Sequence, residues 1–408
     1  MARRHLAARF IPDHPPLVPL LVTVGLLAAH LVPARPIADP TGAPLPPLLH
    51  LQAPWLYVVL APLFTIWDGV SMLSMSRLTW FLIGLAVLYA GWRGGRLLWT
   101  RRWSWLREGL VFTTSLAALA AFIVAGALWH RPMISLAGVP PEMVVADLHS
   151  HTNVSHDVRN TLMRGFDAAA NLRWHRRAGF DAVFITDHNT VEGLGPPSTH
   201  PARCPGIEVS AWKAHVVLLG DSLPIDRSFY DGSLEELLAL LATSDSSHGT
   251  LSLLSLPEYD RNHWNRLDTL VAAGADGLEI VNAAPQAAEF SPAHRDSAIA
   301  LARRTNRFIA GVSDIHGWGA TNLVWNLIAA PGWREAPDPC PLILDRLRTG
   351  FAATQIVERH HLRAESQWPR WLTPLGVVWE AWRGMGTVLL TSWLAWAWAA
   401  WAVARARQ

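Results

Sequence analysis

The sequence predicts an α/β domain, built of βα units around a parallel sheet or barrel and flanked by membrane-spanning helices. Three observations predict this fold class. Long runs without a formal charge lie toward both ends of the chain. Between them, short runs rich in valine and isoleucine alternate with amphipathic stretches, and several of these runs end in histidine or a carboxylate. Short buried strands that alternate with helices are typical of βα units.

The composition of the 408-residue chain excludes several classes of protein. Hydrophobic residues make up 51% and charged residues 16%, and the formal net charge is +2. This balance excludes a disordered chain and an electrostatically driven nucleic-acid binder, so we expect no nucleic-acid partner. The two cysteines, Cys204 and Cys340, exclude a disulfide framework and a four-cysteine zinc module, but they could pair in an oxidising compartment.

The uncharged runs predict membrane-spanning helices, because ~20 apolar residues cross the hydrocarbon core of a bilayer. Four spans are expected, over residues 15–34, 78–94, 109–129 and 384–404. The short span 78–94 needs flanking arginines that extend to the interface. Pro62 and Asp68 interrupt the apolar segment 55–73, which leaves interfacial, re-entrant and spanning helices open for it.

Arginines between the second and third spans predict the topology. Five lie there: Arg93, Arg96, Arg101, Arg102 and Arg107. The positive-inside rule places such a short loop in the cytoplasm. The following span then puts the central domain outside the cytoplasm, and the last span returns to Arg405 and Arg407. We therefore predict an integral protein of the inner or plasma membrane. Its parts are an N-terminal membrane region (1–130), an extracytoplasmic domain (143–360) and a C-terminal helix (384–404).

Apolar runs and amphipathic stretches alternate through the central domain. The runs expected as strands are Met143–Leu148, Ala182–Thr186, Val216–Leu219, Leu251–Leu256, Gly277–Val281 and Phe308–Val312. The stretches expected as helices are Gly165–Arg177, Leu234–Ala242, Asn265–Ala273 and Ala293–Thr305. This alternation indicates a parallel sheet or barrel.

Histidines and carboxylates gather where these strands end. His149 and His151 follow the first strand, and alternate strand residues share a face, so both imidazoles are expected to face one site. The same kind of residue ends three further runs, at His188, Glu208 and Asp314. Neutral imidazoles bind borderline metals, and carboxylates can bridge two ions. The pattern therefore favours a multinuclear divalent-metal site.

Six segments resemble motifs of the PHP (polymerase and histidinol phosphatase) family of metal-dependent phosphoesterases. They are Asp147–Ser155, Ile185–Thr190, Gly206–Ser210, His215–Gly220, Gly277–Asn282 and Ser313–His316. Their order and spacing fit the family over residues 144–357. The resemblance implies a distorted (β/α)7 TIM-like barrel that holds two or three Zn, Mn or Fe ions.

The resemblance also implies metal-ligand roles, with Glu208 as the bridging carboxylate. The positions are His149, His151, His188, Glu208, His215, Asp314 and His316. Two departures concern the ligand set. The family usually has Ser-Asp-Gly where this chain has Ser155-His156-Asp157, so His156 or Asp157 could bind, and we prefer His156 because it is in register. Leu256 stands where the family often has histidine, so His263 could reach in or one metal could have a ligand fewer.

Other polar residues near these motifs receive structural or substrate-binding interpretations. Asp147 is expected to be structural, and Asp187 to fix a histidine tautomer. Histidines outside the motifs are interpreted as surface residues: His175, His200, His294, His360 and His361. Arg159, Asn189 and Lys213 adjoin ligands, so they could contact a phosphate or be solvated loop residues.

The implied function is a membrane-anchored phosphoesterase that uses a metal-activated water. Glu208 would bridge the metals, and Asp157 or a protonated histidine would assist the leaving group. The expected partners are the lipid bilayer and a phosphorylated small molecule, lipid or envelope polymer. A catalytically degenerate PHP-like binding module is the alternative, favoured by Leu256, and amide or ester hydrolysis is a third interpretation.

Overall fold

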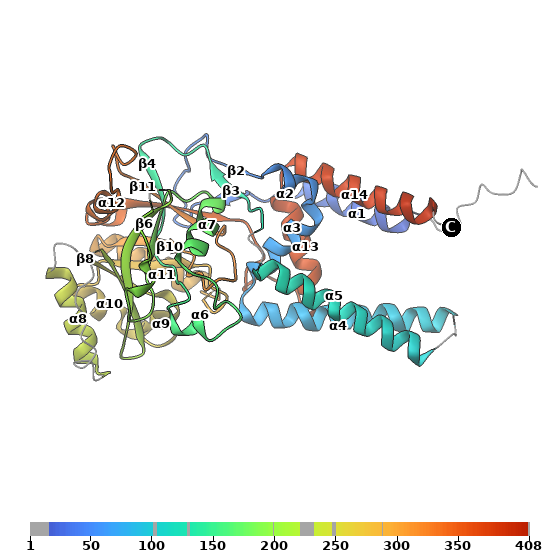
Figure 1. The fold of residues 1–408 in the computed structure, drawn as a ribbon, viewed down its shortest axis with the longest axis horizontal. Coiled ribbons are helices and arrows are strands. Elements are labelled where there is room, and N and C mark those ends of the chain that lie inside the picture. Colours follow the sequence, from blue (N-terminus) through green and yellow to red (C-terminus); the bar gives the residue numbers. More distant parts are fainter. Residues whose placement is uncertain are drawn as a thin grey trace, which may run out of the picture.

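The computed structural model describes residues 16–100, 104–128, 131–198, 200–220, 232–246, 250–287 and 289–406. An α/β domain forms one end of the molecule, and two helical pairs extend from it in the same direction (Figure 1). This confirms the predicted combination of an α/β domain with long apolar helices. Three arginines used in the topology prediction, Arg101, Arg102 and Arg407, lie outside the described residues.

One strongly curled sheet forms the core of the domain. Its strands, in spatial order, are β1 (Ile37–Ala38), β12 (Thr354–Arg359), β11 (Val324–Ala329), β4 (Met143–Asp147), β5 (Ala182–Ile185), β6 (Ala202–Ala211), β7 (Ala214–Gly220), β8 (Thr250–Leu254), β9 (Gly277–Asn282) and β10 (Phe308–Val312). A second, two-stranded sheet pairs β2 (His50–Gln52) with β3 (Ser135–Ala137).

In the part of the chain that the structure describes, the main sheet is mixed and has ten strands, and the distorted (β/α)7 barrel implied by the family resemblance is not confirmed. The pairs β4–β5, β5–β6, β8–β9 and β9–β10 are parallel, whereas β7, β11, β12 and β1 pair antiparallel with their neighbours. The reversal at β7 has a local cause. Trp212 and Lys213 both have positive φ, at 45° and 57°, as a two-residue hairpin requires.

The segment after β10 returns to the segment after β4, at the end of the sheet where the predicted ligands lie. Ser150 and Ile315 form a parallel bridge, and the Asp314 N–H donates to the His149 carbonyl at 2.9 Å. The Asn326 side chain of β11 accepts a hydrogen bond from the Gly311 N–H and donates one to the Gly311 carbonyl, and so links β10 to β11. These contacts set the residues after β10 beside those after β4.

Alternate strand residues fill the interior of the curled sheet. Val144, Phe184, Leu253, Val312 and Ile328 are completely buried in one apolar cluster there. Helices cover the outside: α6 (His156–Arg159), α7 (Ala168–Ala178), α8 (Leu234–Ser246), α9 (Leu256–Arg261), α10 (Leu267–Ala272), α11 (Pro292–Thr305) and α12 (Cys340–Leu347). The helices predicted in this domain are present, with ends that differ by a few residues.

Among the described residues, three helices are long and apolar enough to cross a membrane: α4 (Met75–Thr100), α5 (Trp105–Leu128) and α14 (Thr387–Ala406). They correspond to the spans predicted over 78–94, 109–129 and 384–404. The helix within 15–34 is α1 (Leu17–Leu31), and its 15 residues are fewer than the ~20 that cross a bilayer. That span stays a prediction.

The apolar segment 55–73 forms two short helices, α2 (Trp55–Val59) and α3 (Ala61–Ser71), with a break at Leu60. Neither is long enough to span, and Asp68 explains why the segment lies against the domain. Its carboxylate is 1% exposed and accepts bonds from Arg131 and Arg359, each at 2.8 Å. Two guanidinium groups therefore neutralise the charge that made a lipid-facing helix costly.

The Asp68 contacts join the helices to the domain, because Arg359 ends β12 and Arg131 precedes β3. Burial alone would raise the pKa of Asp68, but the Arg359 and Arg131 charges hold it below its usual value.

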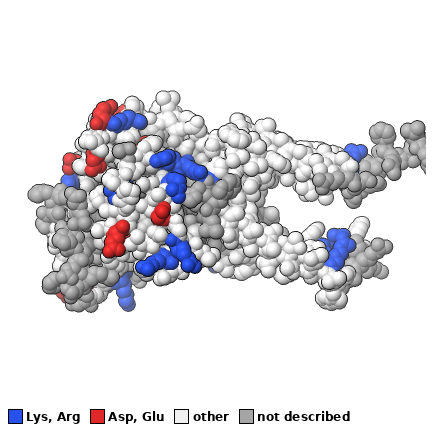
Figure 2. Space-filling view, viewed as in Figure 1, with Lys and Arg blue, Asp and Glu red and all other residues white. Residues whose placement is uncertain are grey.

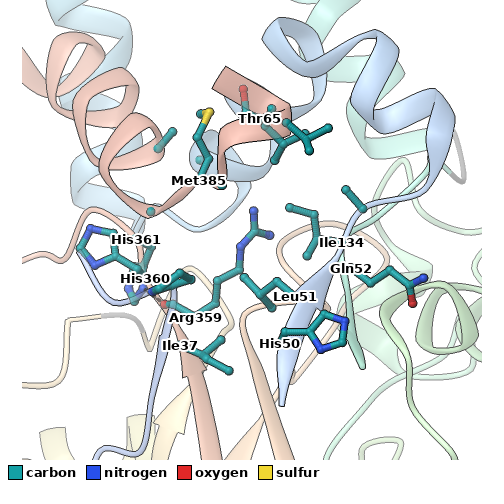
Figure 3. Close-up of a pocket in the computed structure, with 18 of the residues that line it drawn as sticks. Ile37, His50, Leu51, Gln52, Thr65, Ile134, Arg359, His360, His361 and Met385 are labelled. Carbon is teal, nitrogen blue, oxygen red and sulfur yellow. Dashed lines mark hydrogen bonds between the residues drawn. The ribbon is translucent and has the colours of Figure 1, made fainter. Parts of the chain in front are cut away.

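A cavity of about 560 Å³ lies at this junction, and the Arg359 side chain points into it from β12 (Figure 3). Its lining is mostly apolar, from β2, β12, α3, α13 (Thr373–Gly384) and the start of α14.

Cys204 of β6 and Cys340 of α12 form a disulfide across 136 residues of sequence. The sequence left this pairing open, because the two cysteines come together only when α12 packs against the sheet. Cys340 begins α12 and is buried with Ile343 and Leu347 in the cluster that fills the interior of the sheet. The disulfide therefore fastens that helix to the core of the domain.

Candidate metal centre

Two histidines after β4 begin the site. His149 and His151 are completely buried, and their Nε2 atoms lie 3.0 Å apart. Nε2 of His151 is also 3.0 Å from Oδ1 of Asp314, which follows β10. Asp314 has a positive φ of 44°, a conformation that aspartate tolerates better than most residues. The curling of the sheet thus brings the predicted ligands that follow β4 close to those that follow β10.

Glu208 of β6 lies at the centre of the imidazoles. Its Oε2 atom is 3.1 Å from Nδ1 of His188, 3.3 Å from Nε2 of His151 and 3.4 Å from Nε2 of His149. It is buried and forms no hydrogen bond with any of them. Its other oxygen, Oε1, is 3.2 Å from Nδ1 of His215 on β7. An unpaired buried carboxylate oxygen among imidazole nitrogens fits a cation held between them.

Among the described residues, three groups of donor atoms lie close enough to hold an ion, with every atom of a group within 4.8 Å of the others. The groups are His149–His151–Asp314, His151–His188–His316 and His188–Glu208–His215. His151 and His188 each belong to two groups. Sharing of ligands between adjacent positions is what a centre with more than one ion needs, so these residues fit the predicted divalent metals.

Asp157, rather than His156, faces this centre. The Oδ2 atom of Asp157 lies 2.6 Å from Nε2 of His316 and 3.2 Å from Nε2 of His188. His156 is exposed and belongs to none of the three donor groups. The preference for His156 rested on counting register along an extended chain, but Ser155 ends that segment and α6 begins at His156. The first turn of this helix brings the next residue inward.

Glu279 and Asn282 of β9 support the ligands, and we assigned them no role from the sequence. Oε1 of Glu279 bonds Nδ1 of His149 at 2.6 Å. The Asn282 amide donates to Glu279 at 2.9 Å and to Asp314 at 3.1 Å. Glu279 is completely buried and is the one charged residue of β9. A lone carboxylate in such a run requires a partner, and that was the available signal.

His175 is completely buried and was wrongly interpreted as a surface residue. Its Nε2 lies 2.7 Å from Oδ2 of Asp147, and Ser313 donates to the same carboxylate through its hydroxyl and its backbone N–H. Asp147 therefore joins α7 to the segment before Asp314, consistent with the structural role we expected. His175 lies three residues after Leu172 on the buried face of α7, and this helical spacing was the missed signal.

Among the described residues, no histidine side chain forms a hydrogen bond with Asp187. Both carboxylate oxygens accept bonds from Thr152, one from its backbone N–H and one from its hydroxyl, each at 2.6 Å. The expectation that Asp187 fixes a histidine tautomer is therefore wrong. It holds the turn that follows His151, and so it positions the chain between β4 and α6.

Of the three residues predicted to bind substrate, two are exposed and one is hydrogen-bonded to β6. Arg159 and Lys213 are exposed, at the end of α6 and in the β6–β7 hairpin. Asn189 uses its amide to bridge to β6, accepting from the Ser210 N–H at 3.1 Å and donating to the Ser210 hydroxyl at 3.3 Å. Asn189 therefore has a structural partner, whereas the two basic residues extend into solvent.

Leu256 is buried in the apolar core beside α9 and offers only its backbone N–H, which donates to Glu279 at 2.9 Å. His263 does not replace it. Its ring is stacked on Trp212, with centroids 4.7 Å apart, and it belongs to none of the donor groups. The residue that does approach is Glu258, whose Oε1 lies 3.6 Å from Nδ1 of His215. The sequence analysis did not single it out.

The electrostatics of the centre, without ions, favour tightly held protons. Burial would lower the pKa of His316, but the Asp314 and Asp157 carboxylates raise it to about 9. His215 likewise reaches a pKa of about 9, because Glu208 and Glu258 outweigh the effect of burial. For His151, burial and the charge of His316 lower the pKa to about 4. Four carboxylates thus impose a strong demand for positive charge that protons or metal ions can satisfy.

Comparisons with known proteins add little to this geometry. No protein-family model and no curated protein sequence matches the chain. The solved structures that it resembles include two at 17% identity. One is a presumed metal-dependent phosphoesterase from Bifidobacterium adolescentis, with a TM-score of 0.29 over 42% of this chain and 87% of that one. The other is PsfC from Pseudomonas syringae, with a TM-score of 0.36 over 58% of this chain and 95% of that one.

Proposed function

We propose that the chain is a membrane-anchored metal-dependent phosphoesterase with a di- or trinuclear site. One observation carries the proposal. Oε2 of Glu208 is buried and unpaired between His149, His151 and His188, at 3.1–3.4 Å from their nitrogens. Such an atom costs free energy unless a cation binds there. Two or three Zn, Mn or Fe ions suit a donor set of imidazoles and carboxylates.

The ions, when bound, would supply a water of lowered pKa and positive charge for the phosphoryl oxygens. The residues of the chain hold that chemistry in place. Glu208 would bridge neighbouring positions, since its two oxygens face different histidines. Glu279 holds Nδ1 of His149, so that Nε2 faces the centre. The exposed Arg159 and Lys213 are the proposed phosphate contacts at the edge of the site.

Asp157 is proposed as a ligand rather than as the acid for the leaving group. Burial would raise its pKa, but the bonds to His188 and His316 hold it well below its usual range. An ionised carboxylate has no proton to donate. In the proposed assignment Asp157 completes the position formed by His188 and His316, and the leaving oxygen is protonated by another group or by solvent.

Two features support placing the domain outside the cytoplasm. Basic residues gather at the far end of the α4–α5 pair, and the rest of the visible helical surface is largely uncharged (Figure 2). By the positive-inside rule this end is cytoplasmic, which leaves the domain on the opposite side. The Cys204–Cys340 disulfide also suits an oxidising compartment.

The position of the site supports a substrate at or near the bilayer. The loop after β9 accepts a bond from the Met75 N–H at the start of α4, at Pro285 O. The loop after β10, which begins with Asp314 and His316, bonds Asp68 of α3 through Asn322. The loop that carries Asp314 and His316 therefore contacts α3, and the loop after β9 contacts the start of α4. A lipid or envelope-polymer phosphodiester fits this placement, and a phosphorylated small molecule is compatible with it.

The test measures the metal content of the full chain purified in detergent, followed by hydrolysis of mono- and diester phosphate substrates. The proposal expects two or three divalent ions per chain, lost in a His149→Ala/Asp314→Ala double variant, and hydrolysis that depends on them. Ions without hydrolysis would favour the degenerate binding module. A chain without ions, or a double variant with unchanged metal content, would overturn the metal site itself.

A further inference from the structure

One metal position is short of ligands. His188, Glu208 and His215 form a donor group, and His188 is shared with a neighbouring group. Glu208 and His215 belong to this group alone, but Oε2 of Glu208 also lies 3.4 Å from His149 and 3.3 Å from His151. The strand beside that of His215, β8, is followed by Ser255 and Leu256, and the Leu256 side chain lies in the apolar core. No imidazole or carboxylate therefore comes from the end of that strand.

The next turn of the chain brings a carboxylate to this place. Glu258 lies in the first turn of α9, and its Oε1 is 3.6 Å from Nδ1 of His215. Oε1 of Glu208 is 3.2 Å from the same nitrogen. The second oxygen of Glu258, Oε2, is buried and has no hydrogen-bond partner. Both carboxylates thus converge on one imidazole, and each keeps an unpaired buried oxygen.

These separations fit donors that share one ion. Two ligand atoms at ~2.0–2.1 Å from a tetrahedral zinc ion lie about 3.3 Å from each other. The distances of 3.2 Å and 3.6 Å from Nδ1 of His215 bracket that value. The tilt of α9 is held by the support network of the site, because the Leu256 N–H bonds the same Glu279 carboxylate that orients His149.

The surroundings of Glu258 also call for a cation. The side chain of Glu258 is 20% exposed, and the charges of Glu208, Asp314 and Glu279 act on it. No arginine or lysine is paired with Glu258 in the described residues. A largely buried carboxylate near three others is costly unless a positive charge lies among them.

We propose that Glu258 is a metal ligand, completing with His215 and Glu208 a position to which Leu256 contributes no donor. The inference rests on the proposed metal centre and assigns a residue that the family resemblance did not mark. A glutamate from the helix after the strand here supplies the donor that the strand end lacks. With His188, the position would then have two nitrogen and two carboxylate ligands from the chain.

The test compares metal content and Co²⁺ binding of the full chain in detergent. The variants are Glu258→Gln and a matched control, Asp260→Asn, two residues further along α9, where Asp260 bonds His294. We expect Glu258→Gln to hold about one ion fewer than the wild-type chain, or to bind it at least about 10-fold more weakly, and to change the visible spectrum of bound Co²⁺. The control should match the wild-type chain.

A second measurement separates loss of a ligand from damage to the fold. We expect the metal-free forms of Glu258→Gln and the wild-type chain to unfold at the same temperature in detergent. Wild-type metal content and affinity in Glu258→Gln would overturn the role of Glu258 alone. Loss of every ion in Glu258→Gln, together with a lowered unfolding temperature of its metal-free form, would assign it a structural role. A wild-type chain without ions would overturn the proposed function as well.

Discussion

Oε1 of Glu279 lies 2.6 Å from Nδ1 of His149, and both residues are completely buried. Nδ1 therefore carries the proton that the carboxylate accepts, and the lone pair of Nε2 is directed at the centre. Carboxylates that orient metal-bound histidines typically change metal affinity by ~10–100-fold when they are removed. Glu279 comes from β9, so the orientation of His149, which follows β4, is fixed by a residue far along the chain.

We predict that Glu279→Ala weakens Zn²⁺ binding by about 10–100-fold, because His149 loses its fixed tautomer and the Leu256 N–H loses its acceptor. Calorimetric titration of the metal-free chain in detergent measures the change. Glu289→Gln, a change at an exposed carboxylate outside the centre, serves as the control. Equal affinities for Glu279→Ala and the wild-type chain would show that the Glu279 contact does not orient a ligand.

Substitutions at Asp157 and His156 should have different effects. Asp157→Asn removes the charge between His188 and His316, so we expect about one ion fewer per chain or binding weaker by about 10-fold or more. His156→Ala changes an exposed side chain and should leave the metal content unchanged. Elemental analysis of the two purified variants decides between the residues. The reverse outcome would restore the assignment made from the sequence register.

We expect Asp68→Ala to destabilise the chain by about 3–5 kcal/mol, because Arg131 and Arg359 would keep buried charges without a partner. Thermal unfolding in detergent measures the loss. Asp268→Asn is the control, since Asp268 is 82% exposed in its pair with Arg304 and should change stability little. A melting temperature for Asp68→Ala equal to that of the control would mean that the junction does not depend on this charge.

Metal affinity should rise with pH. In the metal-free chain the pKa of His215 is raised from 6.5 to about 9, so its imidazole is protonated over most of that interval. A metal ion requires the neutral ring, and binding must release the proton. The apparent affinity should therefore increase between pH 6.5 and 9, by up to about tenfold per pH unit for each proton displaced. Titrations in buffers of different ionisation enthalpy count these protons, and affinity independent of pH would contradict the prediction.

The proposed topology can be tested with single introduced cysteines, because Cys204 and Cys340 are paired. We expect Asp268→Cys, on the exposed surface of the domain, to react with a membrane-impermeant maleimide added to intact cells. Arg96→Cys, near the far end of α4, should react only after the membrane is opened. Labelling of both cysteines from the same side would contradict a domain and an arginine-rich end on opposite sides.

Local patterns were sufficient for much of the fold and the candidate site. Composition and run length predicted the apolar helices α4, α5 and α14 because a bilayer imposes a length that can be counted along the chain. Alternation along a strand placed His149 and His151 on one face, and the convergence of strand ends at one edge brought in Glu208 and Asp314. These inferences depend only on neighbours in sequence and on the geometry of a single element.

The remaining features depend on contacts between distant segments, which no local pattern encodes. Because α6 begins at His156, its first turn brings Asp157, rather than His156, to the ligands. The packing of α9 places Glu258 near His215, whereas Leu256 offers no donor. Asp68 is tolerated in an apolar segment only because Arg359, from the last strand of the domain, reaches it. The sequence alone determined which kinds of residue meet at the site. Only the tertiary structure decided which of them face one another, because burial and charge pairing are properties of the packed molecule.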